Sequence, residues 1–224
     1  MGFTSVVFFI FIAISACIYF VMPKRGRWIV LLAASAIFYL LSSPKTFVFV
    51  LFTTITTFWG GLRLGKYESL YKQELQEKGD QLTKEEKKTL KAVNLKKKKS
   101  VLVALLLLNF GILAFIKYFT VYFNSLGSLL GLEWLHFDVG MLIPLGISFY
   151  TFQSMGYLVD LYRGKYMPDT NIAKFALFVS FFPQIVQGPI SRHDQLASQL
   201  YEGHSFDYGR IKLGIQLMLW GIFE

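Results

Sequence analysis

Cysteine, histidine and evenly spread charge are all scarce in this 224-residue chain. The single cysteine, Cys17, excludes an internal disulfide. One cysteine and three scattered histidines (His136, His193 and His204) are too few to build a metal cluster of those ligands. Long stretches carry no charged residue, whereas a soluble domain of this size spreads its charges over its surface. The composition therefore predicts an integral membrane protein.

Apolar runs make up most of what is present, since 54% of the residues are hydrophobic and 23 are phenylalanine. Residues 3–22, 28–41, 46–62 and 101–123 are predicted to cross a membrane, which takes roughly 20 apolar residues. No basic residue precedes the first run, while Lys24 and Arg25 follow it, which is the reverse of a signal peptide. We interpret this run as an uncleaved span with its N-terminus outside.

Basic residues are concentrated beside the apolar runs, which argues against nucleic-acid binding despite the net charge of +9. Residues 63–100 hold twelve Lys or Arg and six Asp or Glu, so this segment is predicted to be cytoplasmic. The short basic loop after residue 22 belongs on the same side, because two predicted spans separate it from residues 63–100. Within the long loop, Leu64 to Leu75 have the spacing of an amphipathic helix. Thr83 and Glu86 resemble a capping box that opens a second helix. The alternative is a solvated connector that only sets orientation.

A narrow polar stripe runs along the predicted helix "PLGISFYTFQSMGYLVDLYRG". At 100° per residue, one sector of this helix contains Gly146, Tyr150, Gln153, Ser154, Tyr157, Asp160 and Gly164. Such a stripe avoids lipid, and two interpretations remain open. It either bonds to neighbouring helices, with Asp160 pairing with Arg163, or lines a path for a polar substrate.

The stretch "FFPQIVQGPISRHD" breaks the next apolar run, because Pro183 and Pro189 each remove a backbone donor. Broken helix at membrane depth is tolerated only inside protein or beside a water-filled cavity. The stretch is therefore predicted to be a re-entrant or interrupted element. Ser191 is expected to cap a short helix with Leu196 and Leu200 on its apolar edge. Catalysis by His193 is not favoured, because no nucleophile or second base lies beside it in the sequence.

The motifs "LIPLGISFYTFQSMGYLVDLYRG" and "FVSFFPQIVQGPISRHDQLASQL" together resemble the membrane-bound O-acyltransferase family, and more narrowly its alginate O-acetyltransferase-like branch. The likeness is densest over residues 142–200. It implies a ring of membrane helices around a tunnel. The residues that match the two motifs, and that the resemblance implies line the acyl route, are Tyr150, Gln153, Tyr157, Asp160, Arg163, Gln184, Gln187, Gly188, Pro189 and Arg192.

The resemblance also implies the reaction and its participants. An acyl group, here acetyl, would pass from a cytoplasmic thioester donor, acetyl-CoA or an acyl carrier, to an extracytoplasmic cell-surface polysaccharide, with no bound cofactor or metal. Membrane lipid, an acyl-donor protein and extracellular acetylation partners are the implied partners, in a bacterial plasma membrane. The family's catalytic histidine is expected downstream of Glu224, and His193 is not given its role.

The expected fold is an all-α polytopic membrane bundle of six to seven segments, some of them interrupted. Residues 1–62 are predicted to form three spans, 63–100 the basic cytoplasmic loop, and 101–224 the start of an acyltransferase core. The last apolar run, residues 211–224, is shorter than a span, so an N-terminal fragment without activity of its own is expected. A transporter or flippase, which also uses interrupted helices, and a non-catalytic partner of polysaccharide assembly remain alternatives.

Overall fold

The computed structural model describes residues 5–78, 83–129, 144–185, 188 and 190–223, and this part of the chain is helical without strands. The helices are α1 (Val6–Val21), α2 (Arg27–Ser42), α3 (Phe47–Lys78), α4 (Lys84–Leu129), α5 (Ile147–Tyr162), α6 (Ile172–Ser180), α7 (Phe182–Ile185), α8 (His193–Tyr201) and α9 (Tyr208–Phe223). Short 3₁₀ turns, Lys24–Gly26 and Pro44–Thr46, connect α1 to α2 and α2 to α3. The prediction of an all-α bundle is confirmed.

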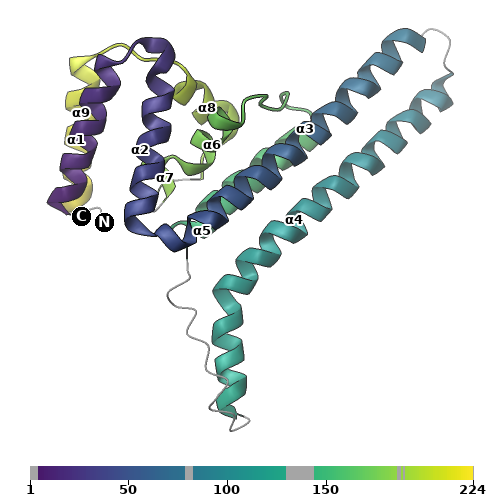
Figure 1. Ribbon diagram of the computed structural model, residues 1–224. Helices are drawn as coiled ribbons and strands as arrows, with labels where there is room; N and C mark the ends of the chain where they lie inside the picture. The colour runs from purple at the N-terminus through teal and green to yellow at the C-terminus, as the bar shows by residue number, and fades with distance from the viewer. Residues whose placement is uncertain (1–4, 79–82, 130–143, 186–187, 189, 224) are drawn as a thin grey trace.

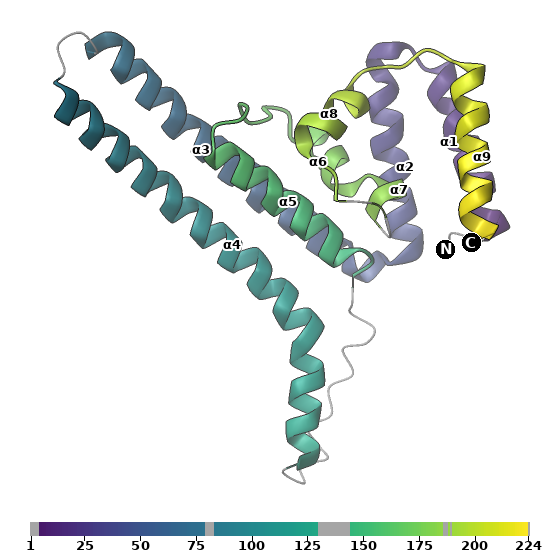
Figure 2. The ribbon, with the colours of Figure 1, turned by 180° about the vertical axis from the view of Figure 1, so that it is seen from behind.

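Two helical hairpins frame the molecule, as Figure 1 shows. The first is formed by α1 and α2, and the second by the much longer α3 and α4. Helix α5 lies along both α3 and α4, while α6 packs against α2, α3 and α8 (Figure 2). The elements that carry the two sequence motifs therefore occupy the space between the hairpins.

Three helical stretches are long and apolar enough to cross a membrane: Lys24–Ser42, Pro44–Glu77 and Lys84–Tyr118. They contain the second and third predicted spans and residues 101–118 of the fourth. Helix α1 is apolar but has only 16 residues, which is about 24 Å of helix against a hydrocarbon core of about 30 Å. The expected six to seven segments also include α5, the α6–α7 pair and α9, none of which is among these three long stretches. The chain is a membrane protein.

The predicted loop between the third and fourth spans consists largely of helix. Helix α3 continues without a break from its apolar part to Lys78, and α4 continues from Lys84 into its apolar part. The expected capping box is present, since Thr83 Oγ1 accepts from the N–H of Glu86 at 3.3 Å and the Glu86 carboxylate accepts from the N–H of Thr83 at 2.8 Å. Two helices that continue into the apolar parts thus replace the two separate loop helices that the sequence suggested.

A buried ion pair ties α3 to α4 where their polar parts begin. Lys98 Nζ lies 2.9 Å from Glu68 Oε2 and 5.6 Å from the centre of the Tyr162 ring of α5. The Lys98 side chain is only 3% exposed. A lysine buried to this extent requires its partner, because removing one member of a buried pair leaves an uncompensated charge.

Arg27 joins the first hairpin to the segment that follows α8. Its guanidinium donates to the carbonyl oxygens of Met22 at 3.0 Å, Phe20 at 3.2 Å and His204. The first two carbonyls belong to the last turn of α1 and the residue that caps it, where intrahelical donors are missing. A nearly buried cation therefore satisfies backbone acceptors from both ends of the chain.

Candidate functional site

The polar stripe of α5 faces the protein interior. Tyr150, Gln153, Ser154, Tyr157 and Asp160 are all buried, whereas Phe152, on another face of the same helix, is 46% exposed. Apolar residues Leu158 and Leu161 are buried as well, because α5 packs against both α3 and α4. The expectation that this stripe avoids lipid is confirmed.

Gln153 connects the first motif to the second. Its amide Nε2 donates to the carbonyl oxygen of Phe178 at 2.8 Å. Phe178 lies in the last turn of α6, where carbonyl groups have no intrahelical donor. The glutamine therefore caps the helix that leads into the interrupted segment.

Asp160 pairs with Lys165 and not with Arg163, the partner that the structural interpretation of the stripe proposed. The distance from Lys165 Nζ to Asp160 Oδ1 is 2.7 Å. Helix α5 ends at Tyr162, and Gly164 with φ of 74° turns the chain back, so that Lys165 approaches the last turn. Arg163 is exposed at this turn. The predicted pair of Asp160 with Arg163 was wrong because it assumed helical spacing, whereas α5 ends at Tyr162.

Asp169 is the centre of a polar cluster that the sequence did not indicate. Its Oδ2 accepts from Tyr201 OH at 2.8 Å and lies 2.7 Å from His193 Nε2, while its backbone N–H donates to Tyr157 OH at 3.1 Å. Burial, reinforced by the Asp169 carboxylate, raises the pKa of the Tyr201 phenol, so this hydroxyl remains a donor. A loop residue thus holds α8 against α5.

His193 is a buried member of this cluster. Its ring lies 4.8 Å from the ring centres of both Tyr157 and Phe178, and its Nε2 is engaged with Asp169. Only 9% of the residue is exposed. This setting fits a packing residue.

The interrupted segment is built from short pieces. Helix α6 ends at Ser180, α7 spans four residues, and α8 begins only at His193. The N–H of Phe182, at the break, donates to Ser35 Oγ of α2 at 3.2 Å, which provides one of the bonds that a continuous helix would have made. The prediction of a broken element inside protein is confirmed.

Ser191 does not cap α8, as had been expected. The residue before the helix is Arg192, which makes no side-chain capping bond. The Ser191 hydroxyl instead accepts from Gln184 Nε2 at 2.9 Å, which ties the two ends of the break together. Leu196 and Leu200 of α8 are buried as expected.

The two motifs touch at Gly146, the residue that precedes α5. Its φ is 69°, in the left-handed region, and a Cβ atom there would lie 1.9 Å from the carbonyl oxygen of Ile185. Glycine is needed for both reasons, since other residues rarely adopt this conformation and none leaves this space free. The close approach of the start of α5 to the end of α7 therefore requires that residue 146 have no side chain.

A cavity of about 300 Å³ lies where α5 meets the segment before α8. It is lined by Gln153, Gly156, Tyr157, Val159, Asp160, Ile190, Ser191 and Arg192. Four predicted site residues, Gln153, Tyr157, Asp160 and Arg192, are thus brought together. Their role in an acyl path stays a prediction.

The other predicted site residues are placed around or away from this cavity. Tyr150 is buried one helical turn before Gln153. The carbonyl oxygen of Gln184 accepts from the N–H of Gly188 at 3.1 Å, and neither these two residues nor Arg163 lines the cavity. Gln187 and Pro189 lie outside the described residues. In the described part of the chain, no three His, Cys, Asp or Glu side chains are grouped so that they could hold a metal ion.

Known proteins similar to this chain include bacterial O-acetylases and O-acetyltransferases by name. It is 29% identical over 213 residues to the probable alginate O-acetylase AlgI of Azotobacter vinelandii, covering 92% of this chain and 38% of that protein. The Pseudomonas syringae pv. tomato protein of the same name is 30% identical over 203 residues, covering 89% and 34%. A Helicobacter pylori peptidoglycan O-acetyltransferase is 30% identical over 146 residues, covering 53% and 27%.

These similarities extend over most of this chain but only over part of the relatives. The chain spans a little over a third of the length of the alginate O-acetylases it matches. No family model matches the sequence, and no solved structure matches it. The aligned region contains the whole of both motifs, since it covers about nine tenths of the chain. The resemblance to membrane-bound O-acyltransferases is therefore confirmed, and the chain is a relative of the alginate O-acetylases.

Proposed function

We propose that this chain is part of a membrane-bound O-acyltransferase that moves an acetyl group from a cytoplasmic thioester donor to a cell-surface polysaccharide. In this reaction a sugar hydroxyl oxygen attacks the thioester carbonyl, and the donor thiol leaves. The names of the relatives support the reaction class, since they include acetylases and acetyltransferases. The observation that carries the proposal is the cavity of about 300 Å³, which both motifs line together.

The cavity supports a passage role by its chemistry. Tyr157 and Gln153 present hydrogen-bonding groups at its wall, and Arg192 and Asp160 add one charge of each sign. A partly enclosed space with a mainly apolar wall and a few polar groups suits an acetyl thioester or a sugar hydroxyl. We assign Gln153, Tyr157, Asp160 and Arg192 to the cavity wall, and Tyr150, Gln184 and Gly188 to its support.

The proposed setting is a bacterial plasma membrane, with the N-terminus outside and the polar parts of α3 and α4 in the cytoplasm. The lysines of this hairpin support that orientation, because basic loops are retained on the cytoplasmic side. The donor, acetyl-CoA or an acyl carrier protein, would approach from the same side. The polysaccharide acceptor and further acetylation proteins would meet the opposite face.

A chimera tests this function. The region of the Azotobacter vinelandii relative that aligns with this chain is replaced by the chain, in cells lacking their own alginate O-acetylase. Restored acetylation of the polysaccharide, measured as released acetate, is expected from the chimera. No acetylation is expected from the 224-residue chain alone, because the resemblance puts the catalytic histidine downstream of Glu224.

The controls separate loss of function from loss of protein. Membrane levels of the chimera are compared with those of the unaltered relative by immunoblotting. A Gln153→Leu chimera is expected to lose most of the acetylation, while Phe152→Leu, on the exposed face of α5, is expected to retain it. A chimera that accumulates normally but transfers no acetyl group would contradict the proposal.

A further inference from the structure

The chain between α5 and α6 is anchored to two helices before it reaches Asp169. Lys165 Nζ lies 2.7 Å from Asp160 Oδ1 of α5, and the N–H of Lys165 donates to the Asp160 carbonyl oxygen at 3.1 Å. The ring of Pro168 lies against Gly65 of α3, where an added Cβ would be 2.4 Å from Pro168 Cγ. Asp169 therefore extends from a connection whose place is set by α3 and α5.

Asp169 connects the two walls of the cavity described above. On the α5 side, its backbone N–H donates to the Tyr157 hydroxyl at 3.1 Å, and Tyr157 lines the cavity. On the α8 side, its Oδ2 lies 2.7 Å from His193 Nε2, and His193 directly follows Arg192 of the opposite wall. Asp169 does not line the cavity itself. One residue outside the cavity thus joins its two walls.

The same carboxylate oxygen holds both ends of α8. It also accepts from Tyr201 OH at 2.8 Å, and Tyr201 is the last residue of the helix whereas His193 is the first. The two ends are about 12 Å apart along the helix axis. Only the His193 end is next to the cavity in sequence, because residues 190–192 belong to the wall. One of the two bonds can therefore be removed beside the cavity, and the other at a distance from it.

His193 depends on Asp169 for its place. Its ring lies 4.8 Å from the ring centre of Phe178 and 5.2 Å from that of Tyr166, and its side chain is only 10% exposed. Without the Asp169 carboxylate, Nε2 would lose its partner in a nearly buried position, which is unfavourable. A shift of His193 that exposes this atom would also move the wall residues that precede it.

We propose that Asp169 is a positioning residue of the acyltransferase, which sets the place of Arg192 through His193 and that of the Tyr157 hydroxyl through its own backbone. The inference rests on the proposed function, because these positions matter for transfer only if the reacting groups pass through this cavity. A misplacement of about 1 Å can lower a rate by about 10²-fold. Asp169 acts through its neighbours and not on the substrates.

A matched pair of variants in the chimera with the Azotobacter vinelandii relative tests the proposal. His193→Phe and Tyr201→Phe each keep a ring and remove one bond to the Asp169 carboxylate. His193→Phe is expected to lower the rate of polysaccharide acetylation at least about tenfold, because the cavity wall moves. Tyr201→Phe is expected to retain most of the rate, although it also loses a bond that stabilises α8. Rates are divided by the amount of chimera in the membrane, measured by immunoblotting.

Substitutions of Asp169 itself separate its geometry from its charge. Asp169→Ala is expected to lower the rate at least about tenfold. Asp169→Asn is expected to retain more of the rate than Asp169→Ala, because the amide keeps an acceptor oxygen at the same place. The control is Asp194→Asn, which removes a carboxylate from the first turn of α8 and is expected to leave the rate nearly unchanged, because Asp194 is exposed.

Distances between spin labels measure the positions of the walls without activity. In the full chain in nanodiscs, with Cys17 replaced by serine, nitroxides at Phe152→Cys of α5 and Gln195→Cys of α8 are followed by double electron–electron resonance. Both positions are exposed. Asp169→Ala and His193→Phe are each expected to broaden the distance distribution.

Several outcomes would overturn the proposal. These are an unchanged rate in Asp169→Ala, an equal loss in His193→Phe and Tyr201→Phe, and unchanged distance distributions in Asp169→Ala and His193→Phe. An equal loss would show that only the stability of α8 matters. If the unaltered chimera transferred no acetyl group, the proposed function would be contradicted instead, and the distance distributions would still decide whether Asp169 holds the two walls.

Discussion

At the scale of single residues, Gln153 is the side chain that most directly couples the two motifs. Replacing Gln153 with Leu keeps the approximate size but leaves the Phe178 carbonyl at the end of α6 without its donor. We expect a loss of about 1–3 kcal/mol in the free energy of unfolding, the usual cost of an unsatisfied buried acceptor. Unfolding by SDS in mixed micelles measures this change.

The matched control for Gln153 is Phe152→Leu, one residue earlier on the exposed face. It is expected to cost less stability than Gln153→Leu, because it removes only the ring contact with Phe110, worth about 0.5–1.5 kcal/mol, and no buried hydrogen bond. If both variants unfold alike, the hydrogen bond to Phe178 does not hold α6 in place.

Tyr201 makes the stability dependent on pH in the alkaline range. Burial and the Asp169 carboxylate raise the pKa of this phenol in the folded state, whereas in the unfolded state it ionises near pH 10. Its contribution is therefore complete below about pH 10 and is lost as the pH rises further, because only the unfolded state then releases the proton.

Tyr201→Phe is expected to be less stable than the original chain at pH 8, since the bond to Asp169 is lost. It should lose less additional stability between pH 9 and pH 11. Unfolding measured at both ends of this range, with the exposed Tyr208→Phe as control, checks the sign. A parallel pH dependence in the Tyr201→Phe variant and the original chain would rule out this residue as the source.

Sequence reasoning identified which residues are polar and inward-facing, but not which of them are partners. The burial of Tyr150, Gln153, Tyr157 and Asp160 follows from helical periodicity alone. Asp169 was missed because it lies in a loop, where no period exists, and its contacts to His193 and Tyr201 are 24 and 32 residues away in sequence. Such contacts form where the chain turns back on itself, and the spacing of residues in the sequence does not predict where that happens.

At the scale of elements, the contact between α5 and α7 depends on Gly146. Gly146→Ala combines a strained left-handed conformation with a Cβ placed 1.9 Å from the Ile185 oxygen. Strain alone costs about 1–3 kcal/mol, and the clash must also displace one of the two elements. We expect a clear drop in unfolding free energy and, in the chimera described above, a loss of acetylation.

Gly156→Ala provides the comparison for this prediction. Gly156 lies inside α5, and no atom lies within 4 Å of a Cβ added there. Alanine is favoured over glycine inside helices by about 1 kcal/mol, so this variant should be as stable as the original or more so. Equal destabilisation in the two glycine variants would show that the Ile185 contact is unimportant.

Helix starts were easier to predict than helix continuity. The capping box of Thr83 and Glu86 follows from two residue types at a fixed spacing, and both of its bonds are present. The continuity of α3 from apolar to charged sequence was not predicted, because a change in composition suggests a boundary even where the backbone makes none. Packing of α3 against α4 and α5 maintains the helix across this change.

At the scale of the whole molecule, the polar parts of α3 and α4 should lie on the same membrane side as the α1–α2 turn. With Cys17 replaced by serine, single cysteines at Arg25 and Lys72 are expected to react with an impermeant maleimide only after the inner face is opened. A cysteine at Lys45, in the turn between α2 and α3, should react from outside intact cells. All three positions are exposed.

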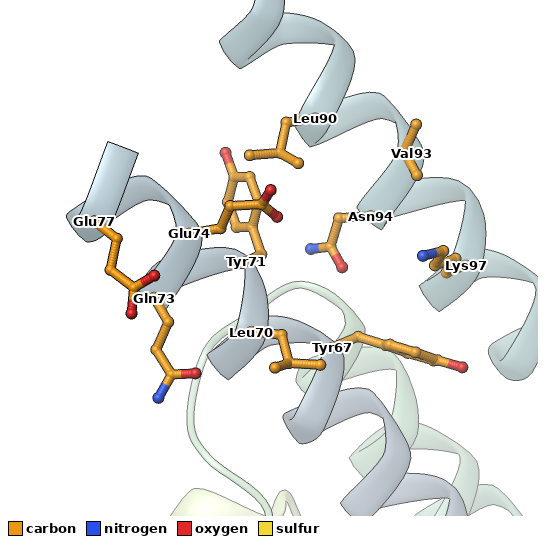
Figure 3. A pocket seen from close by; sticks show the side chains of 10 residues that line it. All are labelled: Tyr67, Leu70, Tyr71, Gln73, Glu74, Glu77, Leu90, Val93, Asn94 and Lys97. Atoms are coloured by element: carbon orange, nitrogen blue, oxygen red, sulfur yellow. The ribbon is translucent and has the colours of Figure 1, made fainter. Parts of the chain in front are cut away.

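If the Arg25 and Lys72 positions were labelled from different sides of the membrane, the prediction that two spans separate them would be wrong. The positions and the expected orientation of the membrane spans could be predicted from the sequence, because they follow from the lengths of the apolar runs and from the basic loops. The pocket between the polar parts of α3 and α4 (Figure 3) was not accessible, because it depends on side-chain packing rather than on hydropathy.

The contacts of Arg27 also bear on the order of biosynthesis. A ribosome makes this arginine 177 residues before it makes His204, whose carbonyl oxygen completes its coordination. Until then, the guanidinium has only the acceptors at the end of α1 and the faces of Tyr19 and Phe20. The contacts of Arg27 that join the first pair of helices to the segment after α8 can therefore form only late in synthesis, after most of the chain has been made.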